Sequence, residues 1–80
     1  MTPRYLLDKF IKETKKRKDK YILLYVDTFR NDYFYVSYPN KKELVENYPL
    51  ENLKNGIRFE GMIRINEDGT IDENLTAKNL

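Results

Sequence analysis

Two runs of strand-forming residues, at positions 20–29 and 32–38, constrain the fold of this chain more than any other feature of its sequence. Both runs are rich in Ile, Leu, Val, Tyr and Phe, which favour extended structure. A short polar turn formed by residues 30–32 separates them, and Pro39 follows the second run. Because proline cannot donate a hydrogen bond to a strand ladder, the second strand ends there. The pattern therefore predicts an antiparallel β-hairpin.

The N-terminal segment predicts an amphipathic helix. Thr2 can cap its N-terminus, and Pro3 suits the first helical position because a backbone N–H would have no partner there. Five side chains recur at helical spacing and form one stripe along the helix: Leu6, Leu7, Phe10, Ile11 and Thr14. Since the stripe stops at Thr14, we expect the basic run that follows, residues 15–20, to fray off the end of the helix.

A second, shorter helix is expected over residues 41–47. Asn40 is its N-cap candidate, and Glu43 lies three residues later, which is the spacing of a capping box. Three residues give this helix an apolar side: Leu44, Val45 and Tyr48. One more helical turn is expected over residues 50–54, and Gly56 after it suits a left-handed backbone conformation.

Residues 57–65 alternate strictly, as expected for a third strand. One set is Ile57, Phe59, Gly61, Ile63 and Ile65, and the other is Arg58, Glu60, Met62 and Arg64. A turn at residues 66–69 and a short edge strand within residues 70–75 follow, and we expect residues 75–80 to be frayed. We therefore predict one small two-layer α+β domain, residues 1–80, ordered helix–strand–strand–helix–strand–strand. Its antiparallel sheet is expected to carry the helices on one face.

The length of the hairpin turn decides which side chains share a face, because one residue of slip moves a whole strand to the opposite face. A three-residue turn places Val26 beside Val36, whereas a two- or four-residue turn places Val26 beside Tyr35. We adopt the three-residue turn because it separates aliphatic from aromatic side chains most cleanly. The aliphatic face, covered by Leu7, Phe10 and Ile11 of the first helix, then contains Ile22, Leu24, Val26, Phe34, Val36, Phe59, Ile63 and Ile65. The opposite face exposes Tyr25, Phe29, Tyr33, Tyr35, Arg58, Met62 and Arg64.

The exposed Tyr/Arg face leads to the first functional prediction. Tyrosine and arginine offer flat, amphipathic contact surface, which is why they dominate binding hot spots. We therefore expect a non-enzymatic protein-binding module, a small regulator or inhibitor of the kind found among phage and mobile-element accessory proteins, or a homodimer joined through this face. The competing explanation is that tyrosine simply favours strands, and that the second helix or a second subunit covers the rings.

The charge distribution suggests an alternative function. The net charge is only +2, but residues 1–20 carry eight Lys/Arg against three Asp/Glu, whereas residues 21–80 carry seven against ten. Six cations lie close together in the basic segment: Lys12, Lys15, Lys16, Arg17, Lys18 and Lys20. With the sheet tyrosines, they would suit a nucleic-acid-binding domain in which lysines neutralise phosphates and rings stack on bases. The competing explanation is a solvated helix end.

Composition excludes several classes of function. The chain has no Cys and no His, so it has no disulfide, no thiolate zinc site, no cysteine nucleophile and no imidazole base. No window approaches the 18 apolar residues that a membrane-spanning helix requires. We expect a cytoplasmic protein with no enzymatic activity and no metal or small-molecule cofactor.

Overall fold

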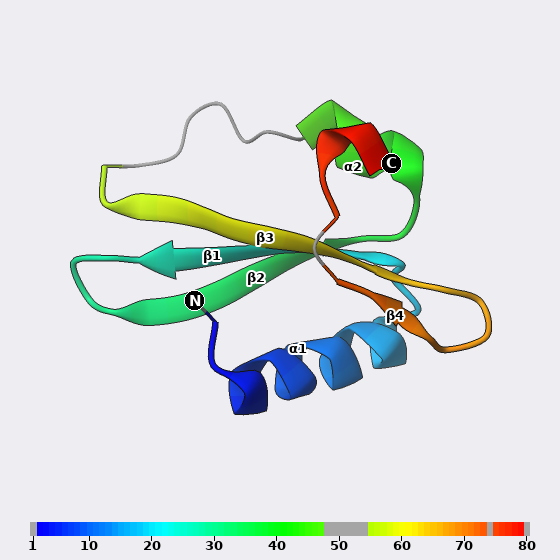
Figure 1. Ribbon diagram of the computed structural model, residues 1–80, viewed down its shortest axis with the longest axis horizontal. Helices are drawn as coiled ribbons and strands as arrows, with labels where there is room; N and C mark the ends of the chain where they lie inside the picture. The colour runs from blue at the N-terminus through cyan, green and yellow to red at the C-terminus, as the bar shows by residue number, and fades with distance from the viewer. Residues whose placement is uncertain (1, 48–54, 74, 80) are drawn as a thin grey trace.

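The computed structural model describes residues 2–47, 55–73 and 75–79, which form two α-helices, a four-stranded antiparallel sheet and one turn of 3-10 helix (Figure 1). In chain order the elements are α1 (Arg4–Arg17), β1 (Tyr21–Asp27), β2 (Asp32–Tyr38), α2 (Lys41–Asn47), β3 (Ile57–Ile65), β4 (Ile71–Asp72) and η1 (Ala77–Asn79). The predicted α+β class and element order are confirmed, including the short returning strand at β4. The helical turn expected over residues 50–54 lies outside the described residues.

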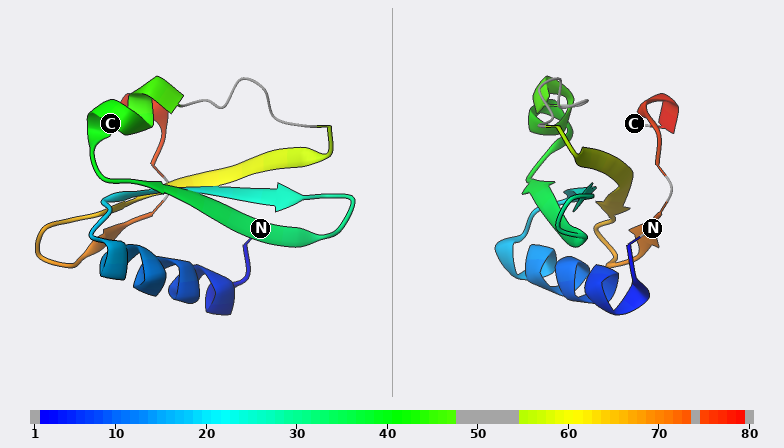
Figure 2. Two further views of the ribbon diagram at one scale, coloured as in Figure 1. Left: turned by 180° about the vertical axis from the view of Figure 1, so that it is seen from behind. Right: turned by 90° about the vertical axis from the view of Figure 1, so that its left-hand side faces the viewer.

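The sheet has the strand order β2-β1-β3-β4, so β1 is an interior strand with a neighbour on each side. α1 lies against one face of the sheet, whereas α2 and the C-terminal segment lie against the other (Figures 1 and 2). The expectation that both helices cover one face is therefore wrong. The physical reason lies in β1, where residues 22–26 are all buried and thus need cover on both sides.

The β1–β2 turn contains four residues, 28–31, and not the three that we expected. Asp27 starts the turn, because its Oδ1 accepts hydrogen bonds from the backbone N–H groups of Phe29, at 3.0 Å, and Arg30, at 3.3 Å. Asn31 ends it with a φ of 56°, a left-handed conformation that asparagine tolerates. Val26 consequently pairs with Tyr33. The two faces of β2 are therefore exchanged relative to the prediction.

A β-bulge in β3 breaks the strict alternation that its sequence suggests. Leu24 of β1 pairs with Gly61, but the next residue, Tyr25, pairs with Phe59, so Glu60 is the extra residue. Phe59 and Ile57 are therefore turned to the α2 face, and only the second half of β3 keeps the predicted orientation.

The apolar side chains accordingly form two clusters, one on each face of the sheet. The cluster under α1 consists of Leu7, Phe10, Ile11, Ile22, Leu24, Ile63 and Ile65, flanked by Leu6, Tyr33, Tyr35 and Ile71. The cluster under α2 consists of Leu23, Tyr25, Leu44 and Met62, flanked by Tyr21, Val36, Tyr38, Ile57 and Leu75. The predicted contacts of the α1 stripe with Ile22, Leu24, Ile63 and Ile65 are confirmed. Those expected for Phe34, Val36 and Phe59 are wrong, because these side chains lie on the opposite face.

Both ends of α1 differ from the prediction. Pro3 is the N-cap, with φ −58° and ψ 145°, and no side chain caps the helix. The helix also continues to Arg17, and Lys18 ends it in a left-handed conformation with φ 64°. The expected fraying is absent because Arg17 in the last turn donates hydrogen bonds to Tyr35 and Ser37 of β2, and because Thr14 one turn before the end is fully buried.

The structure confirms two predictions that were based on local sequence signals, one at the start of α2 and one just before β3. The Glu43 N–H donates to Asn40 Oδ1 at 2.9 Å, which confirms the predicted N-cap. Gly56 has the expected positive φ, 91°. At the other end of the chain, Leu75 donates its N–H to the Met62 carbonyl at 3.2 Å and packs on the α2-face cluster. The segment that we expected to be frayed from residue 75 is thus attached to the sheet at Leu75.

We predict that α2 contributes to stability through one side chain. Leu44 is fully buried, whereas its neighbour Val45 is 51% exposed. Leu44→Ala should lower the free energy of unfolding by about 2–5 kcal/mol, because it leaves a cavity in the α2-face cluster. The matched control Val45→Ala should change it by less than about 0.5 kcal/mol. Urea denaturation followed by circular dichroism measures both, and equal small effects would contradict a two-sided core.

Candidate functional site

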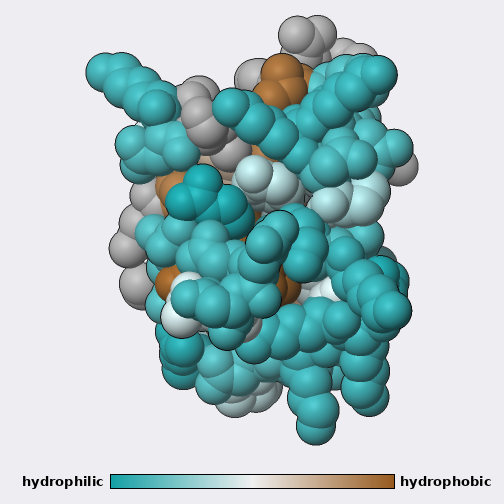
Figure 3. Space-filling view, turned by 90° about the vertical axis from the view of Figure 1, so that its right-hand side faces the viewer, coloured by the Kyte–Doolittle hydropathy of each residue, from teal (hydrophilic) through white to brown (hydrophobic). Residues whose placement is uncertain are grey.

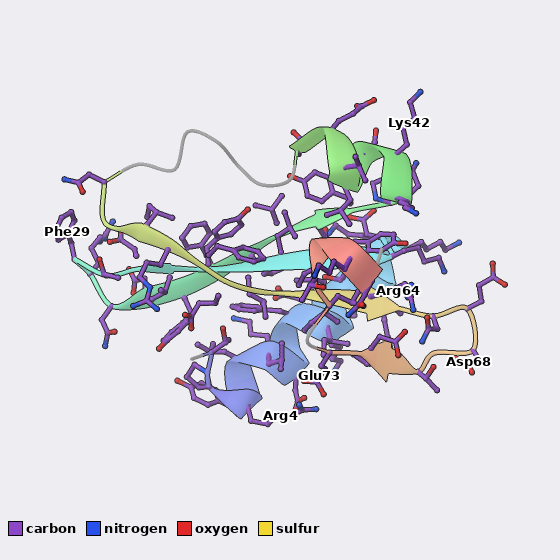
Figure 4. All side chains as sticks on the ribbon, turned by 45° about the horizontal axis from the view of Figure 1, so that its top comes forward. Arg4, Phe29, Lys42, Arg64, Asp68 and Glu73 are labelled. Atoms are coloured by element: carbon purple, nitrogen blue, oxygen red, sulfur yellow. The ribbon has the colours of Figure 1, made fainter. Side chains whose placement is uncertain are left out.

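The seven residues of the predicted Tyr/Arg face do not share a surface. Tyr33, Tyr35 and Arg58 lie on the α1 face, Tyr25, Met62 and Arg64 lie on the α2 face, and Phe29 lies in the hairpin turn. Phe29 and Arg64 are at opposite ends of the molecule (Figure 4). The prediction that they form one exposed face is therefore wrong. The error follows from the four-residue turn, which exchanges the faces of β2, and from the bulge, which reverses the first half of β3.

Two of the predicted anchors belong to the core. Tyr25 and Met62 are each only 1% exposed. The Tyr25 ring stacks on Phe34 with a centroid distance of 5.4 Å and meets the edge of Phe59 at 5.8 Å. Such ring pairs stabilise the α2 side of the sheet. Neither Tyr25 nor Met62 is available to a partner.

Tyr35 joins β2 to α1 in a hydrogen-bond network. Its ring packs against Phe10 at 4.6 Å, and its hydroxyl donates to Glu13 Oε1 at 2.9 Å. The same hydroxyl accepts from Arg17 Nη2 at 2.6 Å, and Arg17 also donates to Ser37 Oγ at 3.0 Å. The hydrogen bond to Tyr35 raises the pKa of Arg17 above its usual value. Arg17 is thus a structural link between helix and strand and not a free cation.

Arg64 is similarly engaged, at the β3–β4 edge. Its Nη2 and Nε donate to Asp72 Oδ2 at 2.6 and 3.2 Å, and its Nε also donates to Asn66 Oδ1 at 3.2 Å. The hydrogen bond with Asp72 raises the pKa of Arg64 and lowers the pKa of Asp72. Arg64 therefore holds the short strand β4 in place.

Exposed aromatic side chains gather instead at the end of the sheet where the β1–β2 turn lies. Phe29 is 76% exposed at the tip of that turn, while Phe34 and Phe59 are 38% and 36% exposed. The Phe29 ring lies directly over Gly56, where a Cβ atom would come within 2.4 Å of it. The Thr28 N–H also donates to the Gly56 carbonyl at 2.7 Å, which joins the turn to the start of β3. The sequence predicts Phe34 and Phe59 on the α1 face. The four-residue turn moves Phe34 to the α2 face, and the bulge at Glu60 moves Phe59 there.

The strongest candidate site is the outer edge of β2. The two edges of the sheet differ. β2 is seven residues long, whereas β3 at the other side pairs with the two-residue β4 only at Arg64 and Ile65 and carries Arg58, Glu60 and a bulge before them. Short strands, lysines, prolines and bulges usually protect an edge from pairing with another chain. Between Asp32 and Tyr38, β2 contains no Lys, Arg, Pro or Gly. Sheet order cannot be recognised from local patterns, so this site was not predicted, although the absence of such residues was visible in the sequence.

The direction of the free backbone groups follows from one hydrogen bond. Tyr38 accepts from the Lys20 N–H at 2.9 Å, so its carbonyl faces the β1 side. Because backbone polar groups alternate along a strand, the N–H and C=O groups of Tyr33, Tyr35 and Ser37 point away from β1. The structure describes no strand on that side of β2. This edge therefore offers three outward pairs of donors and acceptors.

The predicted basic run does not form one patch. Lys12 and Lys16 lie exposed on the outer side of α1, and Lys15 Nζ donates to the Gly69 carbonyl at 3.2 Å. Lys18 ends the helix and Lys20 precedes β1. A hollow of about 470 Å³ lies between these segments and the β3–β4 turn. Its lining includes both positively and negatively charged side chains and consists of Lys15, Lys18, Asp19, Lys20, Ile65, Asn66, Glu67 and Gly69. The surface at this end of the molecule is mostly hydrophilic (Figure 3).

Nothing in the described part of the chain suggests a metal centre, since no three Asp or Glu side chains there are grouped to hold one. Among the described helices, none has the length and apolar character needed to cross a membrane. Comparison of the chain with models of protein families, with curated proteins and with solved structures finds no match. Only the geometry of this molecule therefore supports the candidate site.

The Arg64–Asp72 pair predicts a specific acid sensitivity. The pKa of Asp72 is lower in the folded protein than in the unfolded chain, so its contribution to stability is complete above about pH 4 and is lost as the pH falls through the folded pKa. Asp72→Asn should lower the free energy of unfolding at pH 7 and flatten its decline between about pH 5 and pH 2. Urea denaturation across this range tests it.

The control for this prediction is the same substitution in an Arg64→Gln background. Without the guanidinium, Asp72→Asn should alter the pH profile much less than it does in the wild type. An unchanged effect would show that Arg64 is not what holds the pKa of Asp72 down.

Proposed function

We propose that this protein is a non-enzymatic binding module that recognises a protein partner by accepting an extended segment at the free edge of β2. The observation that carries the proposal is the contrast between the two sheet edges: the β3–β4 edge carries Arg58, Glu60 and a bulge, whereas β2 presents six consecutive uncharged residues, 33–38, without a proline. A long unprotected edge is a template for strand addition.

The side chains beside this edge support a protein partner. Main-chain hydrogen bonds to Tyr33, Tyr35 and Ser37 would supply affinity, and the side chains on either face of β2 would supply specificity. On the α2 face Phe34 is 38% exposed and lies directly on the edge strand. An apolar side chain of the added strand would pair with it across the new ladder. The expected ligand is thus an extended segment with an apolar or aromatic residue at its centre.

Because it would act by binding a protein segment, we propose that this protein is a small regulator or inhibitor. The added strand would be held by the edge of a rigid sheet, which requires no pocket and no cofactor. We also propose a cytoplasmic location, for which the sequence offers the absence of cysteine among its 80 residues.

A matched pair of substitutions at Ser37 tests the strand-addition proposal. Ser37→Pro removes an outward N–H while leaving the β1–β2 ladder intact, and should abolish capture of the partner from cells that express the protein. Ser37→Ala keeps the N–H but loses the side-chain hydrogen bonds with Arg17 and Asp19, so it should still capture the partner. A folded Ser37→Pro variant that captures the same protein equally well would contradict the proposal.

Hydrogen exchange of the unmodified protein provides a second measurement. The amide protons of Tyr33 and Tyr35 should exchange rapidly in the isolated protein, because they face outward, and should become protected in the complex. Protection confined to α1 or α2 would contradict binding at this edge.

A further inference from the structure

We infer that the outer ridge of α1, formed by Tyr5, Lys9, Lys12 and Lys16, is a separate nucleic-acid-binding site that contacts phosphates through its lysines. This ridge differs from the basic run predicted by sequence. It includes Lys9 and Tyr5, which that prediction left out, and it uses none of the sheet tyrosines. It is also independent of the β2 edge.

Helical spacing places the four side chains on one line. They are separated by four, three and four residues, so they lie within about 60° of one another around the helix axis. The buried side of α1, formed by Leu7, Phe10, Ile11 and Thr14, lies opposite. Tyr5 is 74% exposed, and the three lysines are exposed as well. The ridge therefore points directly into solvent.

The acidic side chains of α1 are held by partners on either side of this ridge. Asp8 forms an ion pair with Arg4 at 3.2 Å, and Glu13 accepts the Tyr35 hydroxyl proton at 2.9 Å. Every ion pair between described residues uses an arginine, so the three ridge lysines have no anionic partner among them. Favourable interaction with the helix dipole explains cations only in the last turn, and Lys9 and Lys12 lie before it.

The form of the ridge favours nucleic acid over a lipid surface. An interfacial helix inserts its apolar face into the bilayer, but the apolar face of α1 is already buried on the sheet. From Lys9 to Lys16 the helix rises about 10.5 Å, enough to contact roughly three phosphates of one strand. The exposed Tyr5 ring at the end of the ridge can stack on an unpaired base. A single strand is therefore the expected ligand.

Fluorescence anisotropy with a labelled oligothymidylate tests this site. For three phosphate contacts on a single strand, the logarithm of the association constant should fall linearly with the logarithm of the salt concentration, with a slope of about −2. This slope corresponds to a roughly 20-fold loss of affinity between about 50 and 200 mM salt. Lys12→Gln/Lys16→Gln should reduce the slope to about −0.7. The matched control Lys41→Gln/Lys42→Gln, an equal charge change on the exposed side of α2, should leave the slope unchanged. Tyr5→Ser should weaken binding roughly fivefold or more without changing the slope.

Three outcomes would overturn the inference. The first is no binding of the oligonucleotide at about 50 mM salt, where phosphate contacts are strong. The second is an equal loss in both double-lysine variants, which would reflect net charge alone. The third is equal or tighter binding to phosphatidylserine vesicles, which would identify an anionic lipid surface as the ligand. Ser37→Pro should bind the oligonucleotide like the wild type, so failure here is distinguishable from failure at the β2 edge.

Discussion

The burial of β1 on both faces is the constraint on which the rest of the structure depends. Residues 22–26 form an uninterrupted buried stretch in an interior strand, so each face of the sheet needs its own cover. α1 supplies one cover with a continuous apolar stripe. The shorter α2 supplies the other through Leu44, with Leu75 beside it. The side chains of β2 and β3 then share these two clusters, which decides whether each lies inside or outside.

The elements that sequence predicted well are those whose signals are local. The α1 stripe repeats at helical spacing, and Asn40 caps α2 through a hydrogen bond within three residues. The faces of the sheet could not be predicted in the same way, because each depends on a single residue count. Asp27 sets a four-residue turn, which exchanges the faces of β2, and Glu60 occupies a bulge, which reverses the first half of β3. The uninterrupted apolar run in β1 was the available sign that both faces would be covered.

The candidate site was missed for a related reason. Tyrosine and arginine were expected at an interface, yet the structure uses them to hold the domain together: Tyr35 joins Arg17 to β2, and Arg64 secures β4 through Asp72. Arginine is suited to this role because its planar group donates several hydrogen bonds in fixed directions. Lys9, Lys12 and Lys16 of α1 take part in no such network among the described residues, and their side chains are exposed. The two proposed binding sites are therefore an edge and a ridge. They keep Tyr33, Tyr35, Lys12 and Lys16 from the predicted sets but group them differently.

The difference between the two outer strands also limits how far other chains can extend the sheet. A chain that extends its sheet at both margins can join copies head to tail without end, as in fibres, because a heterologous contact need not close. Here one margin is a two-residue strand tied down by a hydrogen-bonded arginine. The rest of that margin is the first half of β3, which carries two charged residues and a bulge, so the β2 margin is the more open of the two. In the strand addition that we propose, a complex would therefore terminate after a single addition, which permits a long strand without lysine, arginine or proline at the surface without open-ended polymerisation.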